Sequence, residues 1–304
     1  MITNKQPLYI YKTNSYKKMK VLSLFDGISC GRLALERCGI AVDKYYASEI
    51  ETAAIQVAMN HFPDTIQLGD INGIDFTQFK DIDLLIGGSP CQDLSIAKPN
   101  RENLHGEKSN LFYKYVEALR TIKPKYFLLE NVASMNKESK DAITKELGVE
   151  PILIDSALVS AQRRKRLYWT NIPNVTQPED KGILLKDVLE SGKVDRDKSL
   201  CVTRRYAGFS GTQALLCRRY FGKSFGQAVF EGDIETIKNA WKANPRFESN
   251  DVNIRQLTVK ECERLQTLPD DYTAGISKLK RYEAIGNAWT VDVIAHIFKG
   301  LKEL

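Results

Sequence analysis

The sequence predicts an α/β fold built on a largely parallel β-sheet. From residue 20 to about residue 170, short apolar runs alternate with amphipathic stretches, which is the pattern of repeated β-α-β units. Of the 304 residues, 43% are hydrophobic and 27% are charged, so the chain is too apolar to be disordered and too interrupted by charge to span a membrane. The longest apolar runs have the length of strands, and no repeat of solenoid period is found.

The elements can be assigned in order along this alternation. Strands are predicted for the apolar runs at residues 21–25, 45–48, 66–68, 84–86, 126–129, 152–154 and 167–169. Helices are predicted for the amphipathic stretches at residues 32–38, 51–61, 111–121 and 137–147. Further on, Thr258 and Glu261 form a capping box that begins a helix through Leu265, and an apolar helix is predicted over residues 290–298.

The pattern changes after Pro173, where the sequence becomes polar and basic, and it recovers only near Ile254. We therefore expect a main domain made of residues 20–172 and 254–304, a smaller lobe of residues 173–253, and a loose leader of residues 1–19. The six cysteines contain no Cys-x-x-Cys pair and do not cluster with the three histidines. A reduced, cytoplasmic protein is expected.

The turn after the first strand has the composition of a nucleotide-binding loop. Residues 25–28, Phe-Asp-Gly-Ile, follow the strand and open a helix, so small residues and polarised helix amides would face a ligand. Glu49 lies just past the second strand, at the offset of about 20 residues where dinucleotide-type folds place an acid on ribose hydroxyls. Asp70 closes the third strand. These positions predict a ligand cleft at the carboxyl edge of the sheet, and helix capping is the alternative for both acids.

A cysteine and a glutamate stand at the same predicted edge. Cys91 follows the fourth strand in the segment Gly-Gly-Ser-Pro-Cys, and a cysteine behind a rigid proline on such a loop is placed like a nucleophile rather than like a structural thiol. To react it must be a thiolate, stabilised by nearby amides or arginines. Glu130 ends the fifth strand, where burial against apolar residues would favour its protonated form and make it a proton donor.

Two basic segments are candidates for binding an anion. Gln162, Arg164 and Arg166 alternate in an extended stretch, so they share one face and offer donors for phosphate or for carbonyl oxygen. Between residues 196 and 223, basic side chains are interleaved with aromatic ones: Arg196, Lys198, Arg204, Arg205, Tyr206, Phe209, Arg218, Arg219, Tyr220, Phe221 and Lys223. Such a stretch suits a phosphate backbone and base faces, and a solvated basic loop is the alternative.

The ordered series of motifs resembles the cytosine-C5 DNA methyltransferases. In family order the chain carries FDGISCG, the acid of SEIE, GDI, GGSPCQDLS, ENV, QRRKR, RQLTVKECERLQTLPDDYT and AIGNAWTVDVI. The resemblance covers residues 21–298 except for about 173–253, the expected target-recognition region. GGSPCQDLS, VSAQRRKRLYW and NAWTV look like the catalytic domains of animal de novo methyltransferases and related phage enzymes. Ser29-Cys30 replaces the usual glycine pair, and Trp289 follows Asn-Ala where Ser-Val is frequent.

The resemblance implies a Rossmann-like methyltransferase sheet, S-adenosylmethionine as cofactor and double-stranded DNA as substrate. The residues implied for the cofactor are Phe25, Asp26, Gly27, Ile28, Glu49, Ile50, Asp70, Ile71, Pro90, Asn287, Ala288 and Trp289. The last three would line the methionine end, which requires the final helix to return to the main domain. No metal is expected, because neither the chemistry nor any His/Cys spacing requires one.

The resemblance also implies a covalent mechanism of DNA (cytosine-5-)-methyltransferases. Cys91 would add to carbon 6 of a flipped-out cytosine while Glu130 donates a proton to N3 or shares one with it. Arg166 would hold the base carbonyl, and Arg164 would position a phosphate or the cysteine loop. The residues expected to contact DNA are Ser89, Gln92, Arg204, Arg205, Arg218 and Arg219.

Two other functions are compatible with such a sequence. One is methylation of a tRNA, although the Cys-Phe-Thr signature of that branch of the family is not found. The other is a catalytically silent DNA-binding protein, against which the presence of both Cys91 and Glu130 argues. The recognised DNA site, the oligomeric state and the biological setting, whether restriction-modification, phage protection or regulation, stay open.

Overall fold

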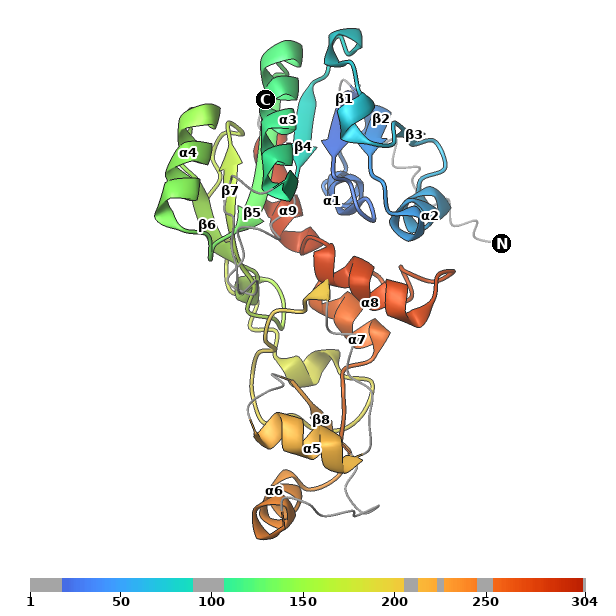
Figure 1. The fold of residues 1–304 in the computed structure, drawn as a ribbon, viewed down its shortest axis with the longest axis vertical. Coiled ribbons are helices and arrows are strands. Elements are labelled where there is room, and N and C mark those ends of the chain that lie inside the picture. Colours follow the sequence, from blue (N-terminus) through green and yellow to red (C-terminus); the bar gives the residue numbers. More distant parts are fainter. Residues whose placement is uncertain (1–17, 90–106, 205–212, 223–226, 245–253, 303–304) are drawn as a thin grey trace, which may run out of the picture.

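The computed structural model describes residues 18–89, 107–204, 213–222, 227–244 and 254–302 (Figure 1). Its main body is a seven-stranded sheet with the strand order β3-β2-β1-β4-β5-β7-β6. The strands are β1 (Met19–Leu24), β2 (Val42–Ser48), β3 (Ile66–Gln67), β4 (Leu84–Gly87), β5 (Tyr126–Val132), β6 (Ile152–Asp155) and β7 (Lys165–Thr170). All pairings among β1 to β5 are parallel, and β7 runs antiparallel between β5 and β6. The predicted α/β fold with a mostly parallel sheet is confirmed.

Side chains that alternate along the strands pack into two hydrophobic cores, one on each face of the sheet. Leu84 and Ile86 point to one face of β4 and Leu85 to the other, as the pleat requires. Helices α1 (Cys30–Arg37), α2 (Thr52–His61) and α9 (Val291–Phe298) pack on the first face, while α3 (Glu107–Ile122) and α4 (Lys137–Leu147) pack on the second. Because α9 lies directly against α1, the end of the chain returns to the main body as expected.

Two helices precede α9 at the carboxyl edge of the sheet. Helix α7 (Val259–Leu265) begins with the predicted capping box, in which Glu261 Oε2 accepts from the Thr258 amide at 2.7 Å and Thr258 Oγ1 accepts from the Glu261 amide at 3.2 Å. Helix α8 (Lys278–Asn287) was not predicted. It begins after the cap residue Ser277, and its many polar residues hide the helical period. In Figure 1 both helices lie between the sheet and a smaller lobe.

The smaller lobe has its own core. It contains α5 (Gln213–Phe221), β8 (Val229–Phe230), α6 (Ile234–Ala243) and β9 (Ile254–Arg255), and Figure 1 shows it below the sheet. The packing assigns two segments to a different part of the molecule than the expected boundaries at residues 173 and 253 do. Strand β9 pairs with β8, so residues 254–255 belong to this lobe. The segment η5 (Leu185–Val188) instead joins the core of the main body. In the described ranges, no helix is both long and apolar enough to cross a bilayer.

Candidate active site

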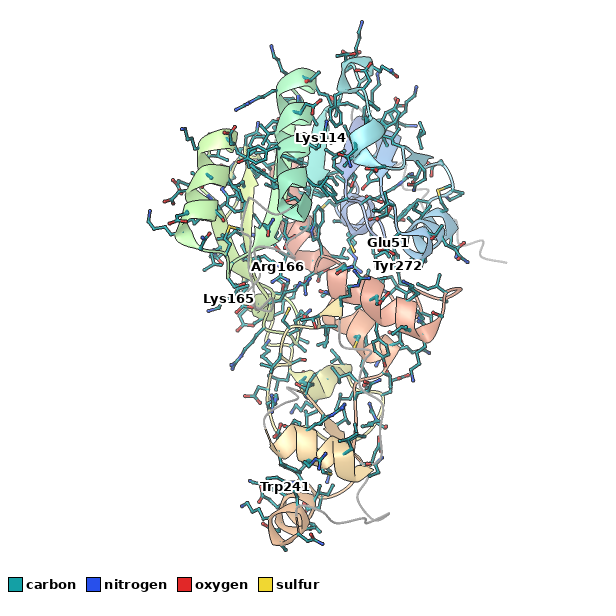
Figure 2. All side chains as sticks on the ribbon, viewed as in Figure 1. Glu51, Lys114, Lys165, Arg166, Trp241 and Tyr272 are labelled. Carbon is teal, nitrogen blue, oxygen red and sulfur yellow. The ribbon has the colours of Figure 1, made fainter. Side chains whose placement is uncertain are left out.

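A cavity of about 340 Å³ opens at the carboxyl edge of the sheet. This volume falls in the range of small-molecule sites. Eleven of the twelve residues predicted to bind a cofactor line it: Phe25, Asp26, Gly27, Ile28, Glu49, Ile50, Asp70, Ile71, Asn287, Ala288 and Trp289. The twelfth, Pro90, lies outside the described residues. Figure 2 labels two other residues that line the cavity, Glu51 and Arg166, near the lower edge of the sheet.

The loop after β1 is held in a strained shape. Phe25 and Ser29 have φ of 60° and 58°, in the left-handed region that side chains other than glycine rarely adopt. Asp26 lies between them, and its carboxylate accepts from the Tyr45 hydroxyl at 2.8 Å and from the Ser29 hydroxyl. Burial raises the pKa of Asp26 against the effect of these hydrogen bonds. Asp26 therefore shapes the loop from within as well as lining the cavity.

Glu49 joins the loop after β1 to the loop after β2. Its Oε1 accepts from the amides of Ile50 at 2.7 Å and Glu51 at 2.9 Å, and its Oε2 accepts from the amide of Gly27 at 2.8 Å. A carboxylate has about four acceptor positions, so one remains on Oε2. The side chain of Ile50 is 69% exposed beside it and lines the cavity.

Asp70 has a capping role. Its Oδ1 accepts from the amide and from the side chain of Asn72, both at 3.0 Å, at the start of η1 (Ile71–Gly73). The capping alternative therefore holds for this oxygen. Oδ2 makes no hydrogen bond within the described residues, and Asp70 is exposed at the cavity. Both functions can coexist on one carboxylate.

Glu130 lies in polar surroundings, which corrects the expectation of an apolar strand end. Its Oε1 lies 2.8 Å from Nε of Arg166, and its Oε2 accepts from Nε1 of Trp289 at 3.0 Å. Strand β7 brings the arginine there, because the antiparallel register sets Tyr168 opposite Glu130 and Arg166 diagonally across from it. The sequence predicted both strands but gave no sign of their relative direction.

Arg164 and Gln162 donate hydrogen bonds to backbone carbonyls of the chain, which fits the carbonyl alternative given above rather than the phosphate alternative. Arg164 is buried, its Nη1 donates to Val202 O at 2.9 Å, and its Nη2 donates to Gly286 O at 3.2 Å and Ala288 O at 2.8 Å. Gln162 Nε2 likewise donates to Leu265 O at 2.8 Å. Of the two roles expected for Arg164, a phosphate contact does not fit these bonds, because its donors fasten the end of α8 to the sheet, and the cysteine loop lies outside the described residues.

Sequence reasoning missed two residues at the site. Asn131 is buried and donates from Nδ2 to Ser89 Oγ at 3.0 Å, which fixes the residue before the predicted nucleophile loop. Cys201 Sγ lies 3.1 Å from Nη1 of Arg164 and 3.9 Å from Nη2 of Arg166. Burial acts to raise the pKa of the Cys201 thiol, but the two arginines outweigh it and lower that pKa. Only the long-range fold, which no local motif reports, brings Cys201 to these arginines.

The residues predicted to contact the base or the duplex differ in exposure. Three predicted residues, Cys91, Gln92 and Arg205, lie outside the described residues. Arg204 is exposed and lines the cavity, with its Nε 3.8 Å from Glu283 Oε1, and Arg218 is exposed on α5. Arg219 is half-buried, and Ser89, expected on DNA, is buried.

Several side chains of the basic and aromatic segment are used to hold the fold together. Lys198 Nζ donates to the carbonyls of Ala157 at 2.7 Å, Ser160 at 3.1 Å and Ile183 at 2.6 Å. Tyr220 is buried in the lobe's core, where Phe221 also packs. These two of the interleaved aromatic rings therefore pack in the core of their own lobe.

Similar sequences are bacterial and phage methyltransferases. Over 191 residues the chain is 31% identical to "Orphan methyltransferase M.SPRI" of Bacillus phage SPR, a match covering 58% of this chain and 43% of that protein. Less than half of the phage protein's length is therefore matched. The chain is 27% identical over 307 residues to "Type II methyltransferase M.NlaX" of Neisseria lactamica, covering 93% of this chain and 96% of that protein.

The fold also resembles solved structures, and a family model matches most of the chain. A DNMT2 structure from Spodoptera frugiperda superposes with a TM-score of 0.70 at 20% identity, covering 94% of this chain and 100% of that one. A putative DNA modification methyltransferase from an Escherichia coli prophage gives a TM-score of 0.60 at 16% identity, covering 94% and 99%. These two likenesses concern the fold. The model of the C-5 cytosine-specific DNA methylases matches residues 19–188 and 193–303, and the chain therefore belongs to that family.

Proposed function

We propose that the chain transfers a methyl group from S-adenosylmethionine to carbon 5 of a cytosine flipped out of duplex DNA, through a covalent adduct with Cys91. The observation that carries the proposal is that the predicted cofactor residues and Glu130 line one cavity. The family depends on S-adenosylmethionine. Within the family, the motifs GGSPCQDLS and NAWTV lead us to infer a kinship with animal de novo catalytic domains.

The cavity fits an adenosyl group. Glu49 Oε2 keeps an acceptor position for a ribose hydroxyl, and Asp70 Oδ2 is available for an amino group. Ile50 offers an exposed apolar side chain against which an adenine ring would pack. When bound, S-adenosylmethionine supplies an electrophilic methyl group on its sulfonium sulfur.

The chain's own residues would activate the base, because carbon 5 of cytosine is a poor nucleophile. The Cys91 thiolate would bond to carbon 6, and this bond would break again once the proton on carbon 5 is lost. Glu130 would share a proton with N3 and so neutralise charge that develops on the ring. Arg166, which contacts Glu130 directly, would hold the base carbonyl. The ring faces are hidden in a duplex, so the base must leave the stack.

DNA would approach across the smaller lobe. We propose that the target-recognition region lies within residues 173–253 and that Arg204, Arg205, Arg218 and Arg219 contact the duplex, with Ser89 and Gln92 near the base. The exposed positions of Arg204 and Arg218 support this assignment. Lys198, whose ammonium group is taken by three carbonyls, is not included.

Transfer of labelled methyl groups tests the proposed function. Duplex DNA, tRNA and no nucleic acid are each incubated with labelled S-adenosylmethionine and the chain, and Cys91→Ser is run in parallel. Label is expected in duplex DNA with the unmodified chain and not with Cys91→Ser. Label in tRNA alone would make the substrate an RNA, and label in neither would leave a silent binding protein. Bisulfite sequencing of the methylated DNA then identifies the recognised site.

A further inference from the structure

Trp289 joins the cofactor side of the cavity to Glu130. Its indole lines the cavity together with Asn287 and Ala288, and its Nε1 donates a hydrogen bond of 3.0 Å to Glu130 Oε2. The other carboxylate oxygen is occupied by Arg166, 2.8 Å away. An indole N–H is a donor only and does not titrate, so it acts on the carboxylate in the same way at every working pH.

Glycines make room for this contact. A Cβ atom at Gly88 would lie 2.9 Å from Nε1 of Trp289 and 3.2 Å from Oε2 of Glu130, at the bond itself. On the other side of the indole, a Cβ at Gly31 would lie 3.4 Å from Cζ3 and 2.4 Å from the side chain of Ile86. The close approach of Trp289 to Glu130 therefore depends on the absence of a side chain at position 88.

The backbone on both sides of Trp289 is also fixed. The carbonyl of Ala288 accepts from Arg164 Nη2 at 2.8 Å and from Gln266 Nε2 at 3.1 Å. Thr290 Oγ1 donates to Gln266 Oε1 at 2.8 Å. All four residues are buried, and a buried polar network with its partners in place is rigid. The indole thus has little freedom to leave Glu130.

We propose that Trp289 is a positioning residue for Glu130, and that its N–H holds the carboxylate in the orientation from which it acts on the base. The inference deepens the proposed function and rests on it, because it assigns a partner to the proton-handling group of that reaction. Losing the N–H should therefore leave Glu130 Oε2 without this anchor, so that the carboxylate can turn about its contact with Arg166.

The variant Trp289→Phe keeps an aromatic ring against the cavity but removes the donor. At saturating DNA, kcat for methyl transfer is expected to fall about 10- to 100-fold, while KM for S-adenosylmethionine changes less than about threefold. The matched control is Trp169→Phe, which removes an indole hydrogen bond of 3.0 Å to Thr144 Oγ1 away from the cavity and should leave kcat unchanged.

A double-mutant cycle separates a role through Glu130 from a role in cofactor binding alone. Trp289→Phe in a Glu130→Ala background, which has no acceptor for the indole N–H, should slow single-turnover transfer no further than Glu130→Ala does by itself. Effects that multiply, or a raised KM with an unchanged kcat, would overturn the inference while leaving the proposed function intact. A wild-type chain that methylates no DNA in the same assay would overturn the proposed function, and the inference with it.

Discussion

Arg164 and Arg166 are separated by one residue, yet they act differently. Arg164 is buried with its donors on three backbone carbonyls, so it fixes the wall of the cavity. Arg166 contacts the carboxylate of Glu130, the proposed proton-handling group, and borders the cavity. Both approach the Sγ atom of Cys201, which is the meeting point of the two guanidinium groups. This environment gives Cys201 a chemical property that can be measured.

Cys201 should react with an alkylating agent before the buried thiols do. The two arginines lower the pKa of Cys201, whereas burial raises the pKa of Cys30 to about 12 and that of Cys262 well above its usual value. Because the thiolate is the reactive form, a lower pKa means more thiolate at neutral pH. Iodoacetamide labelling of the Cys91→Ser variant, followed by peptide mass mapping, checks this order. Equal rates at Cys201 and Cys262 would contradict it.

Removing one arginine charge provides the matched comparison for this labelling. Arg166→Met keeps a long side chain and deletes the guanidinium, so the pKa of Cys201 should rise. Its labelling at neutral pH should then slow, because less of the thiol is present as thiolate. An unchanged rate would mean that Arg166 has no electrostatic hold on this thiol.

At the scale of elements, the end of α8 is where three segments meet. Gly286 lies so close to the chain at Thr203 and Arg204 that a Cβ there would come within 2.3 Å of their backbone. Arg164 donates to the carbonyls of Val202 and Gly286 on either side of this contact. The segment that leads into the proposed DNA-contacting loop is therefore packed against the wall of the cavity.

Gly286→Ala should destabilise this junction. Its methyl group would meet backbone atoms, which cannot move aside as a flexible side chain can, so a loss of about 1–3 kcal/mol in the free energy of unfolding is expected. Gly73→Ala is the control, because a Cβ there has no atom within 4 Å. Urea unfolding of both variants measures the difference. A Gly286→Ala variant as stable as the control would show that the junction is loose.

The elements show what a sequence can and cannot reveal. Apolar runs of strand length predicted β1, β4 and β5, and the capping box predicted α7, because these signals are local. The antiparallel direction of β7 and the position of α8 are set by long-range packing, and both decide what surrounds Glu130. Motif order led to the residues of the cavity, but it could not show that Arg164 faces carbonyls.

At the scale of the whole molecule, the cavity lies between the sheet and the C-terminal helices, beside a smaller lobe with a separate core. In Figure 1 this lobe projects below the sheet, with α5 on it. DNA that reaches the cavity would therefore lie against the lobe. Basic residues that are exposed there should bind phosphates, whereas those that hold the lobe to the main body should not.

Arg218→Ala should weaken DNA binding, whereas Lys198→Met should lower the stability of the fold. Arg218 is exposed, so its loss should weaken DNA binding and reduce the slope of log K against log salt by about 1, with little change in stability. Lys198 is held by three carbonyls, so its loss should lower the midpoint of thermal unfolding more than it changes the salt slope. Fluorescence anisotropy at several salt concentrations and a thermal melt measure both. Identical salt slopes for Arg218→Ala and the unmodified chain would remove Arg218 from the DNA surface.

The covalent step is tested most directly with duplex DNA that contains 5-fluorocytosine at the methylated site. Fluorine on carbon 5 cannot leave as a proton does, so the bond between the thiol and carbon 6 should persist after methyl transfer. Intact mass analysis with S-adenosylmethionine present should show one adduct of protein and DNA, mapped by proteolysis to Cys91. An adduct of equal yield with Cys91→Ala, or methylation of ordinary DNA by that variant, would contradict the account.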